Sequence, residues 1–245
     1  MQRIFSAVVI CAFFSMIPTA HGGMSYLTLT GRIYDLSSSH PNMEPAVSGI
    51  ETGIVMPDLG DDLRPEFNPA TTALSVTNAT DFHDWFHDTP ANMSDGFLID
   101  LLQSSPGAYS FAPTDFYPID DMLLGNEGNP HNYHFAVAVS MPFIYFPGSH
   151  FNVAADDDLW IFVDNELALD LGGVHPGATG AIDFDTLGLT PGESYDLQMF
   201  FAERHMNGSS LGIDTNLGVP EPSTWALAAV GLAAAGLKYR KRRQH

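Results

Sequence analysis

Short runs of alternating apolar and polar residues follow one another along the chain from Met24 onward. A period of two places one set of side chains on a core and the other in solvent, which is typical of half-buried β-strands. We expect strands or hairpins in six segments, residues 25–36, 108–119, 131–147, 159–171, 194–204 and 209–217. Gly, Pro, Asn and Asp separate these segments, and regular spacing of this kind predicts an all-β fold, a β-sandwich.

Three local patterns refine this picture. In "LWIFVDNELALDL" we expect a hairpin that turns at Asp164-Asn165, because Asn tolerates a positive φ. The segment at residues 78–88 predicts a short helix capped by Thr80 or Asp81. Residues 56–69, rich in Pro and Gly, predict a long surface loop.

The N-terminal end has the composition of a targeting segment. Residues 1–22 contain Arg3, then an apolar run, then small residues, which is the order of a secretory signal peptide. We expect cleavage after Ala20 or Gly22. The only cysteine, Cys11, lies in this segment, so the exported protein would use no disulfide and no thiol chemistry.

The C-terminal end joins Pro220, Glu221 and Pro222 to an apolar run at residues 225–237 and a basic tail. That run is shorter than the roughly 20 residues that span a bilayer comfortably, but the basic tail fits a stop on the cytoplasmic side. This order resembles the PEP-CTERM sorting signal that exosortase-type membrane proteases read in Gram-negative bacteria. The resemblance implies transient inner-membrane anchoring, then release or attachment at the cell surface. An ordinary single-pass tail anchor is the alternative.

The segment between the two ends is strongly acidic. Residues 23–220 contain 28 acidic residues and three basic ones, a formal net charge of −25. Nucleic-acid binding is therefore disfavoured, because no basic face exists to meet phosphates. Such a surface keeps an exported protein soluble and concentrates cations near it.

Three consecutive aspartates, Asp156, Asp157 and Asp158, directly precede an apolar stretch. Adjacent carboxylates repel one another and are costly to desolvate unless a positive charge compensates them. Ca²⁺ takes six to eight oxygen ligands, which carboxylates and backbone carbonyls supply. The triplet therefore points to a calcium site, and a solvated gatekeeper of an edge strand is the alternative.

Several candidate ligand-binding residues lie at strand ends or in nearby loops, where binding residues tend to gather. Glu203 could complete the shell of the cation. Arg204 either contacts a ligand or forms a structural ion pair, and His175 and His205 either bind or shape their loops. Trp160 either flanks the mouth of the site or packs in the sheet.

Two histidine pairs are weaker candidates for a metal site. His83 and His87 are four residues apart, as two ligands on a helix would be, but the Glu of the His-Glu-x-x-His protease motif is missing. His131 and His134 stand near a strand start, where turn or edge roles are expected.

Two features of common catalytic sites are absent from residues 23–217, which contain no phosphate loop and no cysteine. Pairs of carboxylates are uninformative in so acidic a chain. We therefore expect binding rather than turnover, with a hydrolase acting on exopolysaccharide as an alternative.

The stretch "ADDDLWIFVDNELALDLGGVHPGATGAIDFDTLGLTPGESYDLQMFFAERHMNGSSLGIDT" resembles the core of the fibro-slime domain, a module of bacterial and slime-mould extracellular matrix and adhesive proteins. The earlier segments "LTGRIYDLSSSHPNME" and "DFYPIDDMLLGNEGNPHNYHFAV" agree with it, so the resemblance covers residues 27–217. It implies a role in matrix, biofilm or adhesion.

That family is similar to the protective-antigen-type carbohydrate-binding β-sandwich, in which two aspartates joined by a cis peptide bond hold a Ca²⁺ that contacts sugar hydroxyls. The matching positions are Asp156 and Asp157, while Asp158 stands where relatives often have glycine. The resemblance implies a jelly-roll-type sandwich that binds exopolysaccharide or a surface glycan with calcium. The chain departs from the pattern at its hairpin turn, which has Asp164-Asn165-Glu166 where Asn-Gly is usual.

These expectations divide the chain into a signal peptide (1–22), a fibro-slime β-sandwich domain (23–217) and a sorting signal with a short transmembrane helix (218–245). A purely structural matrix component without glycan affinity remains the second hypothesis.

Overall fold

The computed structural model describes residues 25–218 of the 245-residue chain. The predicted signal peptide and the predicted sorting signal with its short apolar helix lie outside the described residues. Within residues 25–218, no helix combines the length and the apolar character that crossing a bilayer requires.

Twelve strands form one antiparallel sheet, so the predicted all-β class is confirmed. Their bounds are β1 (Tyr26–Leu36), β2 (Val55–Leu59), β3 (Pro65–Phe67), β4 (Asn92–Ser105), β5 (Ala108–Phe111), β6 (Phe135–Ile144), β7 (His150–Asp156), β8 (Asp158–Val163), β9 (Glu166–Leu171), β10 (Ala178–Asp183), β11 (Ser194–Glu203) and β12 (Ser210–Thr215). A short helix, α1 (Ala79–His83), and a 3₁₀ turn, η1 (Phe184–Thr186), complete the described elements.

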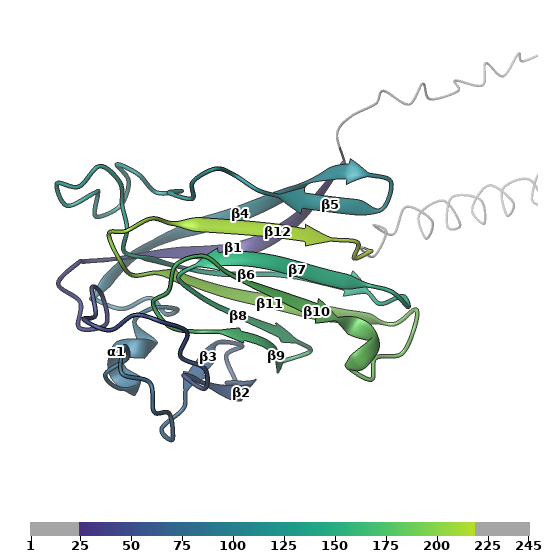
Figure 1. Ribbon diagram of the computed structural model, residues 1–245, viewed down its shortest axis with the longest axis horizontal. Helices are drawn as coiled ribbons and strands as arrows, with labels where there is room; N and C mark the ends of the chain where they lie inside the picture. Colours follow the sequence, from purple (N-terminus) through teal and green to yellow (C-terminus); the bar gives the residue numbers. More distant parts are fainter. Residues whose placement is uncertain (1–24, 219–245) are drawn as a thin grey trace, which may run out of the picture.

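The sheet is continuous and curls over its own inner face. The strand order is β10-β7-β12-β5-β4-β1-β6-β11-β8-β9-β2-β3. Strands β9 and β10 lie far apart in this order and yet contact each other, as do β7 and β8 (Figure 1). The two facing layers that a sandwich requires are therefore parts of one sheet. The main apolar core fills the space between them, with buried members on both sides, among them Ile33, Ile99, Val153, Ile161 and Phe201.

A second apolar core covers the outer face of the central strands β6, β11 and β8. The chain between β1 and β4, which carries β2, β3 and α1, packs against this face (Figure 1). Phe82 from α1 and Trp85 just after it meet Trp160 on β8, with ring centroids 6.0 and 6.3 Å from that of Trp160. All six residues of β8 are buried as a result.

The second core corrects the interpretation of Trp160 as a possible flank of the binding mouth. Its side chain is fully buried, and its indole Nε1 donates a hydrogen bond to Asp170 Oδ1 at 2.9 Å. The alternation along β8 misled the sequence argument, because both faces of this strand are covered.

Most of the strands predicted from alternation are present, and the hairpin turn is where we expected it. Asp164 and Asn165 have φ of 52° and 71° and connect β8 to β9 directly. The helix ends at His83, and its cap is Asn78, whose side chain accepts from the Asp81 amide, rather than Thr80 or Asp81.

Five strands did not appear in the sequence interpretation. The predicted loop at residues 56–69 contains most of β2 and all of β3, and β4, β7 and β10 were not separated from their surroundings. The interruption by Asp95-Gly96 in the middle of β4 breaks its apolar pattern. The strand forms despite this interruption, because β4 pairs with β1 along the whole length of β1.

Candidate metal centre

The connection from β7 to β8 and the end of β11 bring three carboxylates together. Strand β7 ends at Asp156 and β8 begins at Asp158, and the peptide bond between Asp156 and Asp157 is cis. The register of β8 with β11 sets Ala202 opposite Asp158. Glu203, the last residue of β11, therefore lies beside the aspartates.

One carboxylate oxygen from each of Asp156, Asp157 and Glu203 lies within 4.8 Å of the other two, and no other such group occurs among residues 25–218. The Glu203 side chain has no exposed surface. Its Oε1 accepts from the His205 amide at 3.1 Å, but its Oε2 is buried without a hydrogen-bond partner. A buried oxygen without a partner is costly, and a hard cation with oxygen ligands would satisfy it.

Crowding and burial perturb all three acids in the same direction. Burial, and next the neighbouring Asp158 carboxylate, raise the pKa of Asp157 to about 8. Burial and the Asp157 carboxylate raise the pKa of Glu203 well above its ordinary range, and burial also raises the pKa of Asp156. Ionising this group of acids without a compensating charge is therefore unfavourable, whereas a bound cation favours the ionised state.

Asp158, the third aspartate of the triplet, belongs to a different interaction. Its Oδ2 lies 2.7 Å from Arg204 Nε and its Oδ1 lies 3.1 Å from Arg204 Nη2, with both side chains fully buried. Its Oδ1 also accepts from the Gly173 amide at 2.5 Å. We therefore correct the prediction of Asp158 as a metal ligand: a charge-assisted pair satisfies its carboxylate.

Arg204 is likewise structural and is not in contact with the pocket. Its Nη1 donates to the carbonyls of Asn42 and Ser75, its Nη2 donates to Ser75 Oγ, and the guanidinium lies 4.7 Å from the centroid of Trp85. All five of its N–H groups thus have acceptors, counting the bonds to Asp158. Of the two roles expected for Arg204, contact with a ligand or a structural ion pair, the structure shows the ion pair.

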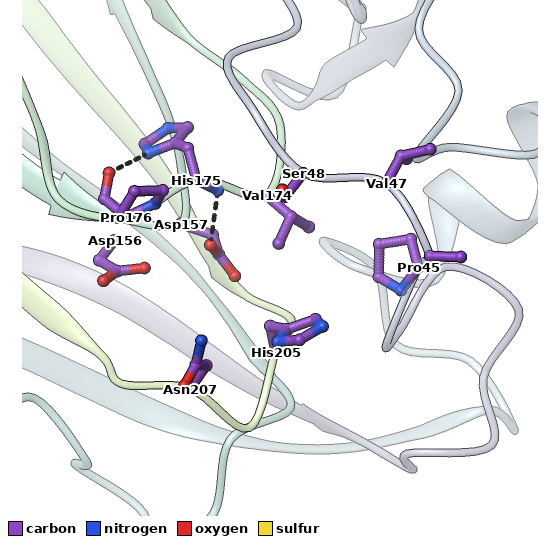
Figure 2. A pocket seen from close by; sticks show the side chains of 11 residues that line it. Pro45, Val47, Ser48, Asp156, Asp157, Val174, His175, Pro176, His205 and Asn207 are labelled. Atoms are coloured by element: carbon purple, nitrogen blue, oxygen red, sulfur yellow. Dashed lines mark hydrogen bonds between the residues drawn. The ribbon is translucent and has the colours of Figure 1, made fainter.

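A pocket of about 350 Å³ opens beside the carboxylates. Figure 2 shows Asp156 and Asp157 on one side of it, with His175 and Pro176 above them and His205 and Asn207 below. The His175 amide donates to Asp157 Oδ1 at 2.9 Å. The His175 ring is buried and lies within hydrogen-bond distance of two carbonyls, those of Leu171 and Pro176. His175 thus shapes the pocket, while the partly exposed His205 ring borders it.

The weaker histidine candidates lie elsewhere and form no metal-binding group among the described residues. The rings of His83 and His87 stack at 3.6 Å, and His87 Nε2 lies 2.7 Å from Asp62 Oδ2. His131 stacks on a tyrosine and pairs with Asp120, and His134 is buried beside Glu44.

Sequence reasoning missed the opposite wall of the pocket, which residues 45–48 form (Figure 2). These residues lie far from the aspartates in the chain and carry no motif of their own. Only long-range pairing brings them to the site.

Comparison with known proteins adds independent evidence. The PA14 domain model matches residues 149–224, which contain the three clustered acids, and the PEP-CTERM protein-sorting motif matches residues 218–243. Protein psiD of Dictyostelium discoideum is 34% identical over 81% of this chain, and Protein psiR is 32% identical over 89%. The chain spans only 43% and 24% of those relatives.

Two solved PA14 domains also align with the chain. One, from the antifreeze protein MpAFP, is 10% identical over 80% of this chain and 84% of its own, with a TM-score of 0.34. The other, a sugar-binding domain from an RTX adhesin, is 10% identical over 77% and 88%, with a TM-score of 0.32. With scores this low, the assignment rests on the sequence matches alone. This chain is a PA14-domain protein with a PEP-CTERM sorting motif, homologous to the Dictyostelium psi proteins.

Proposed function

We propose that this chain is an exported surface protein that holds a Ca²⁺ ion with Asp156, Asp157 and Glu203 and binds carbohydrate beside it. The observation that carries the proposal is the buried Glu203 carboxylate, whose Oε2 has no hydrogen-bond partner and which clusters with the carboxylates of Asp156 and Asp157. Three anionic oxygens suit a hard cation, and they stand at the border of a pocket open to solvent.

Each side chain has a defined part in this proposal. Asp156, Asp157 and Glu203 supply charged oxygens, and the His175 amide holds the Asp157 carboxylate in place. When bound, the ion would offer its remaining coordination positions to sugar hydroxyls. The buried pair of Asp158 and Arg204 supports the loop behind the site and takes no part in binding the ion.

The two sequence matches support the cellular part of the proposal. A PEP-CTERM motif next to the PA14 domain fits processing by an exosortase-type protease after transient inner-membrane anchoring. Delivery to the cell surface would place the pocket among exopolysaccharides, in matrix, biofilm or adhesion. We propose binding rather than turnover, and the fibro-slime assignment of the domain stays a prediction.

Thermal unfolding with calcium and with chelator tests the cation site. We expect saturating calcium to raise Tm by about 5–10 °C, because a ligand at 100 times its Kd stabilises the folded state by about 2.7 kcal/mol. Glu203→Gln should lose most of this shift while its Tm in chelator stays equal or rises, because the amide removes a buried carboxylate.

The matched control is Asp95→Asn, which neutralises an exposed aspartate on β4. It should keep the full calcium shift. If the unmodified protein shows no shift, or if both variants lose it equally, the acids do not form a calcium site and the structural matrix role becomes the better hypothesis.

A further inference from the structure

Residues 45–48, Pro-Ala-Val-Ser, form a strap across the pocket from the carboxylates. In Figure 2 the strap runs along the opposite side, with the Pro45 ring and the Val174 side chain between it and the acids. No hydrogen bond in the described structure involves a strap residue. What these four residues contribute is therefore the surface they present to the pocket.

The first end of the strap is anchored through Glu44. The Glu44 amide donates to the Arg204 carbonyl at 2.9 Å, and Glu44 Oε1 accepts from the Met206 amide at 2.9 Å. The same oxygen lies 2.9 Å from Nε2 of the buried His134, and Glu44 Oε2 lies 3.4 Å from His205 Nε2. Glu44 thereby joins the strap to the end of β11, where the candidate ligand Glu203 also lies.

The other end is anchored on the segment after β9, at the carbonyls of Val174 and Gly172. The Gly49 amide donates to the Val174 carbonyl at 2.5 Å, and the Glu51 amide donates to the Gly172 carbonyl at 2.6 Å. Gly173 has a φ of +106°, and a Cβ there would lie 2.4 Å from the Gly49 carbonyl oxygen. The strap is therefore held at a set distance from the acids.

The surface that lines the pocket away from the acids is aliphatic. Its apolar members are Pro45, Ala46, Val47 and Val174, and Ser48 is the one polar residue beside them. No Phe, Tyr or Trp lines the pocket. An aromatic ring would offer a flat face to the C–H face of a sugar, whereas these small groups form a wall that suits a methyl group.

The charge of the pocket selects against acidic sugars. Apart from His175 and His205, its ionisable lining residues are carboxylates. The three clustered acids would leave a net negative charge even beside a divalent cation, and Glu44 adds another carboxylate near His205. A sugar that carries a carboxylate or sulfate would meet like charge.

We propose that the strap makes the site selective for a neutral sugar that bears a methyl group, either a 6-deoxy sugar or an acetylated one. The inference rests on the proposed calcium-dependent carbohydrate binding, whose ion would hold the hydroxyl edge of the sugar while the aliphatic wall receives the methyl group.

Calorimetric titration of the purified protein in saturating calcium tests the selectivity with matched sugars. L-rhamnose should bind at least about fourfold more tightly than L-mannose, which differs by one hydroxyl at C6, because one buried methyl group accounts for about that factor. N-acetylglucosamine should exceed glucose in the same way, and glucuronate should bind more weakly than glucose.

Pro45→Ser should lower the ratio of the Kd for L-mannose to the Kd for L-rhamnose towards one. The calcium-dependent shift in Tm should be kept. Val174→Thr, a change of nearly equal shape, is the second variant in case Pro45→Ser perturbs the fold. Leu74→Ser, which changes an exposed leucine outside the pocket, should keep the preference.

The outcomes separate the two proposals. If calcium does not shift Tm, or if none of these sugars binds, the proposed function is overturned and the selectivity with it. Calcium-dependent binding that is equal within each sugar pair, a preference that survives both strap-side variants, or tighter binding of glucuronate overturns the selectivity alone.

Discussion

Asp156, Asp157 and Asp158 are neighbours in the chain, but their carboxylates lie in three environments. Asp156 is half-buried and borders the pocket, Asp157 is buried and accepts amide hydrogen bonds from His175 and Arg204, and Asp158 pairs with the Arg204 guanidinium. The buried pair compensates one of the three charges inside the protein. The other two, with Glu203, are left for a cation.

At the residue scale, we predict that Arg204→Gln destabilises the protein by about 3–5 kcal/mol, because it leaves the Asp158 carboxylate buried without its counter-ion. Arg32→Gln is the matched control, since Arg32 forms an exposed pair with Asp88 and should cost less than about 1 kcal/mol. Urea unfolding in chelator measures both variants. Similar losses would mean that the buried pair contributes no more than a surface pair.

The strand β1 lies between β4 and β6, and one glycine of β1 and one of β4 differ in the room that their surroundings leave for a side chain. At Gly31, a Cβ would lie 1.9 Å from the Ala138 carbonyl oxygen on β6. At Gly96 on β4, a Cβ would meet nothing within 4 Å. Glycine is therefore required at the first position by close packing and is not required at the second.

At the element scale, we predict that Gly31→Ala costs about 3 kcal/mol, because β1 must move away from β6 to admit the methyl group. Gly96→Ala should be neutral or slightly stabilising, because alanine restricts the unfolded chain more than glycine does. The two midpoints of chemical unfolding test this directly. Equal effects would show that the β1–β6 contact yields easily.

Burial makes four acidic groups of the molecule easier to protonate in the folded state, and these are Asp35, Asp156, Asp157 and Glu203. Burial raises the pKa of Asp35 to about 6, against which its hydrogen bonds from Asn132 and Leu124 act, and the pKa of Asp157 to about 8. The folded state therefore binds more protons than the unfolded state between these values and the ordinary pKa of aspartate. By linkage, the free energy of unfolding must fall as pH rises through this range.

At the scale of the whole molecule, we predict that stability in chelator decreases from pH 5 to pH 8. Asp35 alone accounts for about 1.5 kcal/mol of this decrease. Asp35→Asn should flatten the profile by that amount, whereas Asp95→Asn, at an exposed site, should not. Urea unfolding at several pH values measures the slopes. Saturating calcium should oppose the decrease, because a bound cation favours the ionised acids and its binding releases protons.

The sequence alone predicted much of the architecture, because its causes are local. Alternation identified β1, β6, β11 and β12, and the Asp164-Asn165 turn followed from the tolerance of such residues for positive φ. The excess of acids and the triplet at residues 156–158 pointed to a cation. Composition, periodicity and turn chemistry act over a few residues, so they can be read without knowledge of the fold.

Tertiary structure decided what depends on residues far apart in the chain. The sheet curls, and the second core buries Trp160 on the outer face of β8. Asp158 pairs with Arg204, and the register of β8 and β11 places Glu203 beside Asp157. Tertiary structure also brought the strap at residues 45–48 to the pocket. Neighbours of this kind depend on register and packing over long separations, and a local pattern carries no information about either.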